Sequence, residues 1–505
     1  MTVSSSRRSF CKAGAAVAFA LASNTSAYPS YEKARGSVFD VRTGRGIPNV
    51  RVSNGRDLVL SDRRGEYELP VRPGDTPFLI KPRDYRTLLN ENYLPQISNH
   101  SKSGTDFFLE PCDENEPIRV LLIADPQPGD DTELFYLSRY IERIRSTERY
   151  DAVVVLGDLV GDNFNLYSRY DHIMSRLGAP IWNIPGNHDV DLSCRTPIHA
   201  KKMWQDRYGP GSRAFEIGAT SFIVLDNIGL RVEANRGLSY YGSIGDDNLA
   251  FMNNYLKTLP IDQSIVLLTH IPLASSLSAV RDDCHTHDTF EVLSLLADRN
   301  CVSFSGHMHA FEQHLIPFGK SYHNHRVLNA LSGSWWSGPF ARDGLPISQS
   351  CDGTPNGWYI LEIDRGEIDL QFIQARNGEP YRINLVEILD GKKRLLDNVI
   401  QRDRSDASCF QINVFEGGPH TRVEALLDEK MHLNVSHVFD VDLQTCDLFD
   451  QAGETLKSWV RPVESTHLWH VDIPCDLACG SHHLLGRIIQ GDQRVYEFRY
   501  PFYVA

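Results

Sequence analysis

The stretch LLIADPQPGD (residues 121–130) runs four apolar residues, Leu121 to Ala124, directly into the acidic side chain of Asp125. A short apolar run bounded by turn-forming residues is typical of a buried strand. A carboxylate at the end of such a strand needs a partner, because an unpaired buried charge is energetically costly. The pattern therefore predicts that Asp125 meets a positive partner, with Gln127 two residues further along the same loop.

Apolar strands and amphipathic helices alternate along the central part of the chain. Residues 131–146 predict an amphipathic helix, with Leu134, Leu137, Ile141 and Ile144 on one face. Strands that alternate with helices predict an α/β sheet, whose ligands gather at the carboxyl ends of the strands. Three later segments are typical of hairpin strands and favour a mixed α/β sandwich over a simple doubly wound sheet: 214–229, 326–336 and 357–373.

The length of the chain and the β-rich pattern of its two flanking regions predict three folded domains. At 505 residues the chain is too long for one core, at roughly 100–200 residues per domain. Short β-rich pieces separated by turn residues flank the α/β part and predict two small all-β sandwiches. The expected boundaries are 28–112 for the N-terminal β-sandwich, 113–375 for the α/β domain and 376–505 for the C-terminal β-sandwich.

The first 27 residues predict an export signal. Arg7 and Arg8 precede an apolar run from Ala13 to Ala22, which is too short to span a bilayer, and small residues follow up to Ala27. The string SRRSFCK resembles a twin-arginine signal, which implies a periplasmic or secreted protein. The alternative is a disordered basic tail. No later stretch is long and apolar enough to predict a transmembrane segment.

The charge of the chain excludes some partners. The formal charge is −14, and removal of residues 1–27, with three basic residues and no acid, would change it to −17. So acidic a chain is a poor electrostatic match for nucleic acids or anionic membranes. An anionic substrate would need a local positive centre, and a bound metal ion would supply one.

Chemically active side chains follow five consecutive predicted strands. They are two acids, two amides and four histidines: Asp125, Gln127, Asp158, Asn187, His188, His270, His307 and His309. Carboxylate and imidazole ligands suit divalent Mn, Fe or Zn, and one carboxylate can bridge two ions. If the GHMH segment (306–309) stays extended, its two histidines lie on one face. Neighbouring glycines let backbone and ligands approach closely. Composition and placement thus predict a binuclear metal site.

These residues form five blocks that resemble those of the calcineurin-like metallophosphoesterase superfamily. The family pattern is D-x-H, G-D, G-N-H-D/E, a lone H and G-H-x-H, in that order. This chain has Asp125-Pro126-Gln127, Gly157-Asp158, Gly186-Asn187-His188-Asp189, His270, and Gly306-His307-Met308-His309. The resemblance covers about half the chain. The flanking β modules are similar to the N- and C-terminal domains of a mostly exported bacterial branch.

The resemblance implies a role for each residue. Asp158 would bridge two metal ions, of which one would also be bound by Asp125, Gln127 and His309, and the other by Asn187, His270 and His307. A metal-bridging hydroxide would attack phosphorus in line. His188 would protonate the leaving oxygen or hydrogen-bond to a phosphate oxygen. Asp162 is the candidate to orient His188, although many relatives have the acid one residue earlier, where this chain has Gly161.

Gln127 departs from the family pattern, because most members have histidine there. An amide oxygen is a neutral, harder and weaker ligand than imidazole, which would favour Mn or Fe over Zn. Some branches with D-x-Q resemble active phosphoesterases. The other reading is that Gln127 hydrogen-bonds to the loop or the substrate.

Histidine and tryptophan pairs also occur outside the five blocks. The pairs His285/His287 and His323/His325 are assigned structural or surface roles. Trp335 and Trp336 are expected in the core or in a pocket wall, with substrate stacking as the alternative.

Two functions follow from the sequence. The first is an exported, metal-dependent phosphoesterase that hydrolyses a small phosphomonoester or phosphodiester with two divalent ions. The alternative is a non-catalytic binding or scaffold protein with a degenerate phosphoesterase domain. The complete ligand set favours the enzyme, since only Gln127 deviates.

Overall fold

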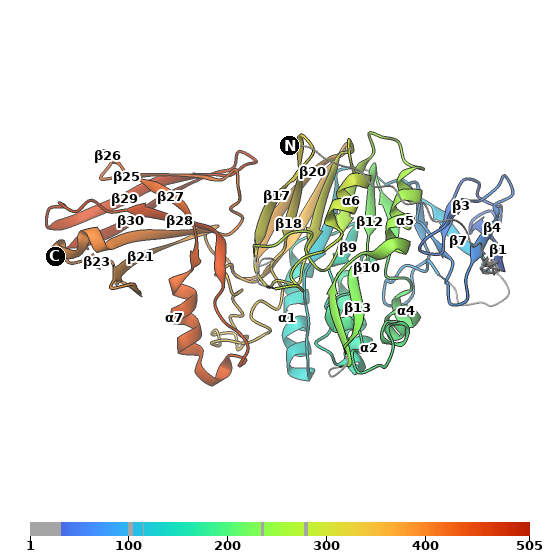
Figure 1. The fold of residues 1–505 in the computed structure, drawn as a ribbon, viewed down its shortest axis with the longest axis horizontal. Coiled ribbons are helices and arrows are strands. Elements are labelled where there is room, and N and C mark those ends of the chain that lie inside the picture. Colours follow the sequence, from blue (N-terminus) through green and yellow to red (C-terminus); the bar gives the residue numbers. More distant parts are fainter. Residues whose placement is uncertain (1–31, 99–104, 115, 234–236, 277–280) are drawn as a thin grey trace, which may run out of the picture.

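The computed structural model describes residues 32–98, 105–114, 116–233, 237–276 and 281–505. The described residues form a row of three parts, with a central sandwich between a smaller N-terminal part and an elongated C-terminal part (Figure 1). The predicted signal segment, 1–27, lies outside the described residues. Among the described residues, no helix combines the length and the apolar character needed to cross a membrane.

The central part is a mixed α/β sandwich of two sheets, as the sequence predicts. The first has the order β10-β9-β8-β19-β20 (Ile181–Asn183, Ala152–Val155, Ile118–Ile123, Gly357–Asp364, Glu367–Gln374). The second has the order β11-β12-β15-β16-β18-β17 (Arg213–Ile217, Thr220–Val224, Ser264–Leu268, Cys301–Ser305, Ser321–Val327, Glu312–Phe318). A separate hairpin joins β13 (Ile228–Glu233) to β14 (Gly237–Gly242).

The direction of the strands brings the predicted site residues to one edge. Strands β8, β9 and β10 run parallel in the first sheet, and β15 and β16 run parallel in the second. All five are short, apolar and largely buried. Because both faces of these strands are covered, polar groups lie in the loops at their ends, and the predicted site residues follow the carboxyl ends.

Helices cover the outer face of each central sheet. Helix α1 (Asp131–Thr147) begins at Asp130, whose side chain accepts a hydrogen bond from the Glu133 amide. Its predicted apolar face, Leu134, Leu137, Ile141 and Ile144, packs with α2 on the first sheet. The second sheet is covered by α5 and α6. The remaining helices have these bounds: α2 Tyr167–Met174, α3 Pro197–Ala200, α4 Lys202–Tyr208, α5 Gly245–Leu256, α6 Thr289–Leu295 and α7 Leu443–Ala452.

The two flanking parts each contain two sheets around a separate apolar core. In the N-terminal part they are β4-β1-β7-β6 (Glu66–Val71, Glu32–Asp40, Phe107–Pro111, Tyr85–Thr87) and β3-β2-β5 (Leu58–Leu60, Arg51–Ser53, Phe78–Leu79). In the C-terminal part, one is β22-β21-β24-β28-β27 (Lys392–Leu395, Tyr381–Leu389, Ser408–Val414, Glu464–Asp472, Val435–Val441). The other is β23-β30-β29-β25-β26 (Val399–Ile400, Val495–Val504, Gly480–Ile489, Arg422–Leu427, Met431–His432).

One predicted strand is wrong over most of its length. Residues 326–336 were expected to be a hairpin strand, but β18 ends at Val327 and turns follow. Trp335 and Trp336 both have left-handed backbones, with φ of 54° and 57°. Non-glycine residues rarely adopt this backbone conformation, and it is incompatible with an extended strand at these two positions.

A buried hydrogen bond between a carboxylate and a histidine joins the central and C-terminal parts. The Oδ2 atom of Asp352, just before β19, lies 2.9 Å from Nε2 of His467 on β28, and both side chains are fully buried. The Asp352 carboxylate also accepts hydrogen bonds from the amides of Phe311 and Thr354. Burial alone would raise the pKa of Asp352, but His467 and these amides lower it.

We expect Asp352→Ala to lower the free energy of unfolding by about 3–5 kcal/mol, because it leaves His467 and two backbone amides buried without their partner. Urea denaturation checks this. The matched control is Asp364→Ala, which removes an exposed carboxylate paired with exposed Arg365 and should change stability by about 0.5 kcal/mol or less. If Asp352→Ala and Asp364→Ala have the same free energy of unfolding, the buried pair makes no net contribution to stability.

Candidate metal centre

The five polar loops meet around Asp158, which lies in the loop after β9, beyond Leu156 and Gly157. Its side chain is only 2% exposed. The Oδ2 atom accepts a hydrogen bond from Nε2 of Gln127 at 3.2 Å, whereas Oδ1 lies 3.3 Å from Nε2 of His270. The Oδ1 atom also accepts a hydrogen bond from the backbone amide of His188 at 2.9 Å. The two oxygens of one carboxylate therefore face residues from two different sheets.

The other predicted ligands lie on either side of Asp158 in two groups. On one side, Nε2 of His309 lies 2.9 Å from Oε1 of Gln127 and 3.9 Å from Oδ1 of Asp125. On the other side, Nε2 of His270 lies 3.0 Å from Oδ1 of Asn187. Possible ligand atoms of Asp158, His270 and His307 lie within 4.8 Å of one another. The structure thus brings together all seven residues that the sequence singled out as ligands.

The hydrogen bonds of two histidines suit metal binding. Nδ1 of His270 lies 2.7 Å from the Leu156 carbonyl oxygen, and Nδ1 of His309 lies 2.6 Å from that of Gly333. A ring nitrogen that faces a carbonyl donates its proton, so in the neutral ring the Nε2 lone pair faces the centre. There, among the described residues, it meets amide and carboxylate oxygens. Two facing lone pairs repel unless a proton or a metal ion lies between them. The His309 ring is neutral, so a divalent metal ion suits the space between its Nε2 atom and the Gln127 oxygen.

The charges at the centre also attract a cation. Burial raises the pKa of Asp125 to about 8, because nothing in its surroundings fully replaces water. Burial alone would lower the pKa of His270, but Asp158 and Asp125 raise it to about 9. Burial lowers the pKa of His309 to about 4 and that of His307 to about 3, which leaves both rings neutral. The carboxylate of Asp158, whose pKa burial alone would raise but the neighbouring histidines lower, therefore attracts positive charge, and the neutral imidazoles of His307 and His309 are available as ligands.

Two glycines create room for the acidic side chains. A Cβ atom on Gly186 would lie 2.1 Å from Oδ1 of Asp158, and one on Gly306 would lie 2.3 Å from Oδ2 of Asp125. No side chain fits at either position without displacing the carboxylate. This is the close approach that the sequence predicted for the glycines beside the ligands.

The backbone of the ligand residues is strained. Five of them have left-handed φ angles between 40° and 74°: Asp125, Gln127, Asp158, His307 and His309. Each such position costs about 1–3 kcal/mol and persists only where its surroundings hold it. The condition under which the GHMH segment would place both histidines on one face of a strand is not met, because β16 ends at Ser305 and both histidines lie in a bend.

His188 lies at the exposed edge of the centre. Its Nδ1 atom lies 2.9 Å from Oδ1 of Asp162, and about a third of its side chain is exposed. Burial alone would lower the pKa of His188, but the carboxylates of Asp158 and Asp162 raise it to about 9. The four-residue spacing from Asp158 to Asp162 therefore still allows the contact with His188. Asp162 makes it from a left-handed backbone, with φ of 59°.

The cleft above the centre is lined by Trp335, an expected pocket wall, and by further residues that the sequence did not single out. The cleft has a volume of about 340 Å³, and its walls include Tyr240, Arg281, Trp335, Trp459 and Arg461. The ring of Trp335 stacks on His309 with centroids 3.8 Å apart, which makes it a pocket wall. No local sequence pattern marks the other four. Tyr240 and Arg281 lie outside the five blocks, and Trp459 and Arg461 come from the C-terminal part, far along the chain.

The two histidine pairs outside the five blocks and Trp336 have packing and hydrogen-bond contacts of their own. His323 and His325 are buried on β18 and share the hydroxyl of Ser303. The rings of His285 and His287 pack on each other, with centroids 4.7 Å apart. Trp336 is buried and donates a hydrogen bond to the carbonyl oxygen of Pro126 at 2.7 Å, which holds the loop that carries Gln127.

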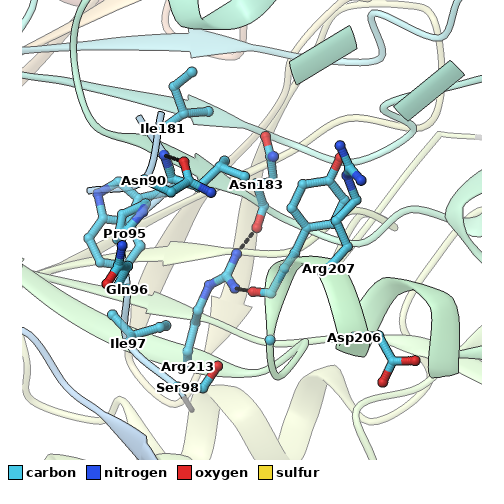
Figure 2. Close-up of a pocket in the computed structure, with 14 residues that line it drawn as sticks. Asn90, Pro95, Gln96, Ile97, Ser98, Ile181, Asn183, Asp206, Arg207 and Arg213 are labelled. Carbon is cyan, nitrogen blue, oxygen red and sulfur yellow. Dashed lines mark hydrogen bonds between the residues drawn. The ribbon is translucent and has the colours of Figure 1, made fainter. Parts of the chain in front are cut away.

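A second cavity, of about 180 Å³, lies between residues 90–98 and the central part (Figure 2). Its buried Arg213 donates hydrogen bonds to the carbonyl oxygens of Asn183 and Tyr208. Burial lowers the pKa of Arg213 to about 10. Arg213 thus ties the start of β11 to the ends of β10 and α4, and none of the predicted site residues lines this cavity.

Family models match three consecutive parts of the chain. Residues 118–311 match the calcineurin-like phosphoesterase model, 32–111 match the N terminal of calcineurin-like phosphoesterase, and 325–496 match its C terminal. The chain belongs to the calcineurin-like phosphoesterase family. The resemblance seen in the five sequence blocks is confirmed, as is the mixed α/β core with strand-rich flanking parts.

Two known proteins are similar to this calcineurin-like phosphoesterase. A 3′,5′-cyclic-nucleotide phosphodiesterase of Nostoc sp. (strain PCC 7120) is 23% identical over 185 residues, which are 36% of this chain. The chain spans 62% of the length of that relative. The structure of a purple acid phosphatase, PPD1 from yellow lupin (Lupinus luteus) seeds, matches 66% of this chain and 68% of its own, with 12% identity and a TM-score of 0.38.

The two readings of Gln127 predict different metal binding. If its amide oxygen is a ligand, Gln127→Ala should weaken one of two metal sites by about 10–100-fold and spare the other. Gln127→His should restore tight binding, because imidazole is the stronger ligand for late first-row ions. Calorimetric titration of Mn²⁺ and Zn²⁺ into the stripped variants checks this.

The control for this titration is Gln371→Ala, which changes an exposed glutamine on β20. Two binding steps unchanged from wild type in Gln127→Ala would show that Gln127 only hydrogen-bonds to Asp158 and His309.

Proposed function

We propose that this protein is a phosphoesterase that uses two divalent metal ions to hydrolyse a phosphomonoester or phosphodiester. The observation that carries this proposal is the position of Asp158, whose two carboxylate oxygens face two separate groups of ligand side chains. Membership of the calcineurin-like phosphoesterase family supports the reaction class.

Each ion would have its own set of protein ligands in addition to Asp158. One set is Asp125, Gln127 and His309, and the other is Asn187, His270 and His307. Two divalent ions held there would supply a water nucleophile at neutral pH and would neutralise charge on the phosphoryl oxygens. Mn, Fe and Zn all suit carboxylate, amide and imidazole donors.

The chain itself supplies the proton for the leaving group. His188 lines the cleft, and Asp162 accepts a hydrogen bond from its Nδ1 atom, which orients the ring. Its other ring nitrogen is then available to protonate the leaving oxygen or to donate a hydrogen bond to a phosphoryl oxygen. Asp162 acts through His188 and is a positioning residue.

The experiment that tests this function measures 4-nitrophenol release from 4-nitrophenyl phosphate and bis(4-nitrophenyl) phosphate, with and without added Mn²⁺. Metal-dependent turnover of either ester is expected. The similar Nostoc protein acts on 3′,5′-cyclic nucleotides, so these diesters belong in the same assay. Absence of turnover with every ester, at full metal loading, would favour the alternative of a binding or scaffold protein.

We also propose export to the periplasm or medium through residues 1–27, which carry the Arg7–Arg8 pair. Twin-arginine export carries proteins that are already folded, which would suit a site that takes up its metal ions in the cytoplasm. Replacing both arginines with lysine should leave the protein in the cytoplasmic fraction. Normal export of that variant would contradict the proposal.

A further inference from the structure

The C-terminal part supplies one wall of the cleft above the proposed metal centre. The segment from Thr455 to Val463 lies between α7 and β28, and Trp459, Arg461 and Val463 line the cleft directly. Tyr240, His188 and Arg281 line the same cleft from the central part. A substrate held at the metal centre therefore meets both parts of the molecule.

This wall is fixed in place by several contacts. The Gly338 amide donates to the carbonyl oxygen of Thr455 at 3.1 Å, and the Val463 amide donates to that of Cys351 at 3.0 Å. Val460 is buried with Phe449 and Cys351, and Trp335 packs against this cluster. The wall is thus part of the folded structure and not a loose loop.

The side chain of Trp459 presents an unusual surface. It is 60% exposed, although large apolar side chains are normally covered. The Lys457 ammonium lies 5.5 Å from the centre of its ring, and Lys457 is itself held by Glu133 of the central part. An exposed indole braced at the mouth of a cleft is suited to stacking against a planar group of a ligand.

Arg461 differs from the other arginine of the cleft in its pairing. Arg281 forms an ion pair with Asp283 at 2.9 Å, which offsets its charge. Within the described part of the chain, Arg461 has no ion-pair partner, and its Nη1 atom donates to a backbone carbonyl. In a protein with a formal charge of −14, this guanidinium is an uncompensated positive charge beside the metal centre.

We propose that Trp459 and Arg461 form a subsite for the alcohol portion of the substrate. The planar ring of that portion stacks on Trp459, and a second anionic group on the ring binds Arg461. The substrate class is then a phosphate ester of a ring-containing alcohol that carries its own negative charge. This inference rests on the proposed function, because the phosphoryl group of the same substrate occupies the metal centre.

Three phosphonates separate the contributions of the subsite without any hydrolysis. Methylphosphonate, phenylphosphonate and 3-carboxyphenylphosphonate add first a ring and then an anion, and calorimetry with the Mn²⁺-loaded protein measures their affinities. We expect each addition to tighten binding about tenfold, within the range of single stacking and charge-assisted contacts. Equal affinities for the three, or no binding of any, would overturn the subsite.

Variants assign each gain to its residue. Trp459→Ala should bind phenylphosphonate no more tightly than methylphosphonate. Arg461→Ala should lose the tenfold gain from the carboxylate, whereas Arg461→Lys should keep part of it. The control is Arg365→Ala, a largely exposed arginine on the β19–β20 turn, which should bind all three ligands as wild type does. If Arg461→Ala retains the preference for the carboxylate, Arg461 does not bind the anion.

Hydrolysis of the matched esters distinguishes a failure of the proposed function from a failure of the subsite. Phenyl phosphate and 3-carboxyphenyl phosphate, with their methyl diesters, differ only in the carboxylate. If wild type prefers the carboxylated phosphonate but hydrolyses none of these esters, the proposed function fails and the subsite stands. Hydrolysis of both esters with equal kcat/KM, together with equal phosphonate binding, overturns the subsite and leaves the proposed function intact.

Discussion

Replacing Asp158 with asparagine is expected to abolish phosphoester hydrolysis and to lower the metal content of the purified protein. The neutral amide can still accept the hydrogen bond from the His188 backbone, so the fold should survive. It cannot share a negative charge between the two ligand groups. Losing several kcal/mol of transition-state stabilisation corresponds to a fall in kcat/KM of about 10³-fold or more.

Elemental analysis together with 4-nitrophenyl ester turnover checks this result. The control is Asp364→Asn, which alters an acid at the surface, far from the five loops, and should change neither quantity. An Asp158→Asn protein that keeps two metal ions and near-wild-type turnover would rule out Asp158 as the shared ligand.

His188→Ala is expected to lower turnover with little effect on metal content, because the His188 side chain belongs to neither ligand group. General acid catalysis contributes about 10²–10⁴-fold, and less when the leaving group needs no proton. Alkyl phosphate esters should therefore lose far more rate than 4-nitrophenyl esters. A plot of log kcat/KM against leaving-group pKa should become steeper in the variant.

Asp162→Asn provides the matched comparison for His188. It keeps the ring and weakens the 2.9 Å contact that orients it, so it should reproduce the same leaving-group dependence with a smaller loss. If alkyl and 4-nitrophenyl esters lose rate equally in His188→Ala, the histidine does not protonate the leaving group and serves instead to bind the phosphoryl group.

Local sequence patterns were sufficient to predict the central fold and to list the candidate ligand residues that the structure brings together. The apolar run that ends at Asp125 is the buried strand β8, and residues 131–146 are the helix α1 with the expected buried face. Short apolar strands alternating with helices can pack in few ways, and in all of them the carboxyl ends of the parallel strands meet. For this reason, a list of residues at strand ends was also a list of neighbours.

Tertiary structure alone decided the contacts within that list and the wall above it. His307 and His309 have left-handed backbones, because packing around Asp125 and Gly306 holds a conformation that local preference disfavours. Trp459 and Arg461 reach the cleft because Val460 packs against the central part. Contacts between residues so distant in the chain depend on how whole domains pack, and no short pattern of residue types encodes them.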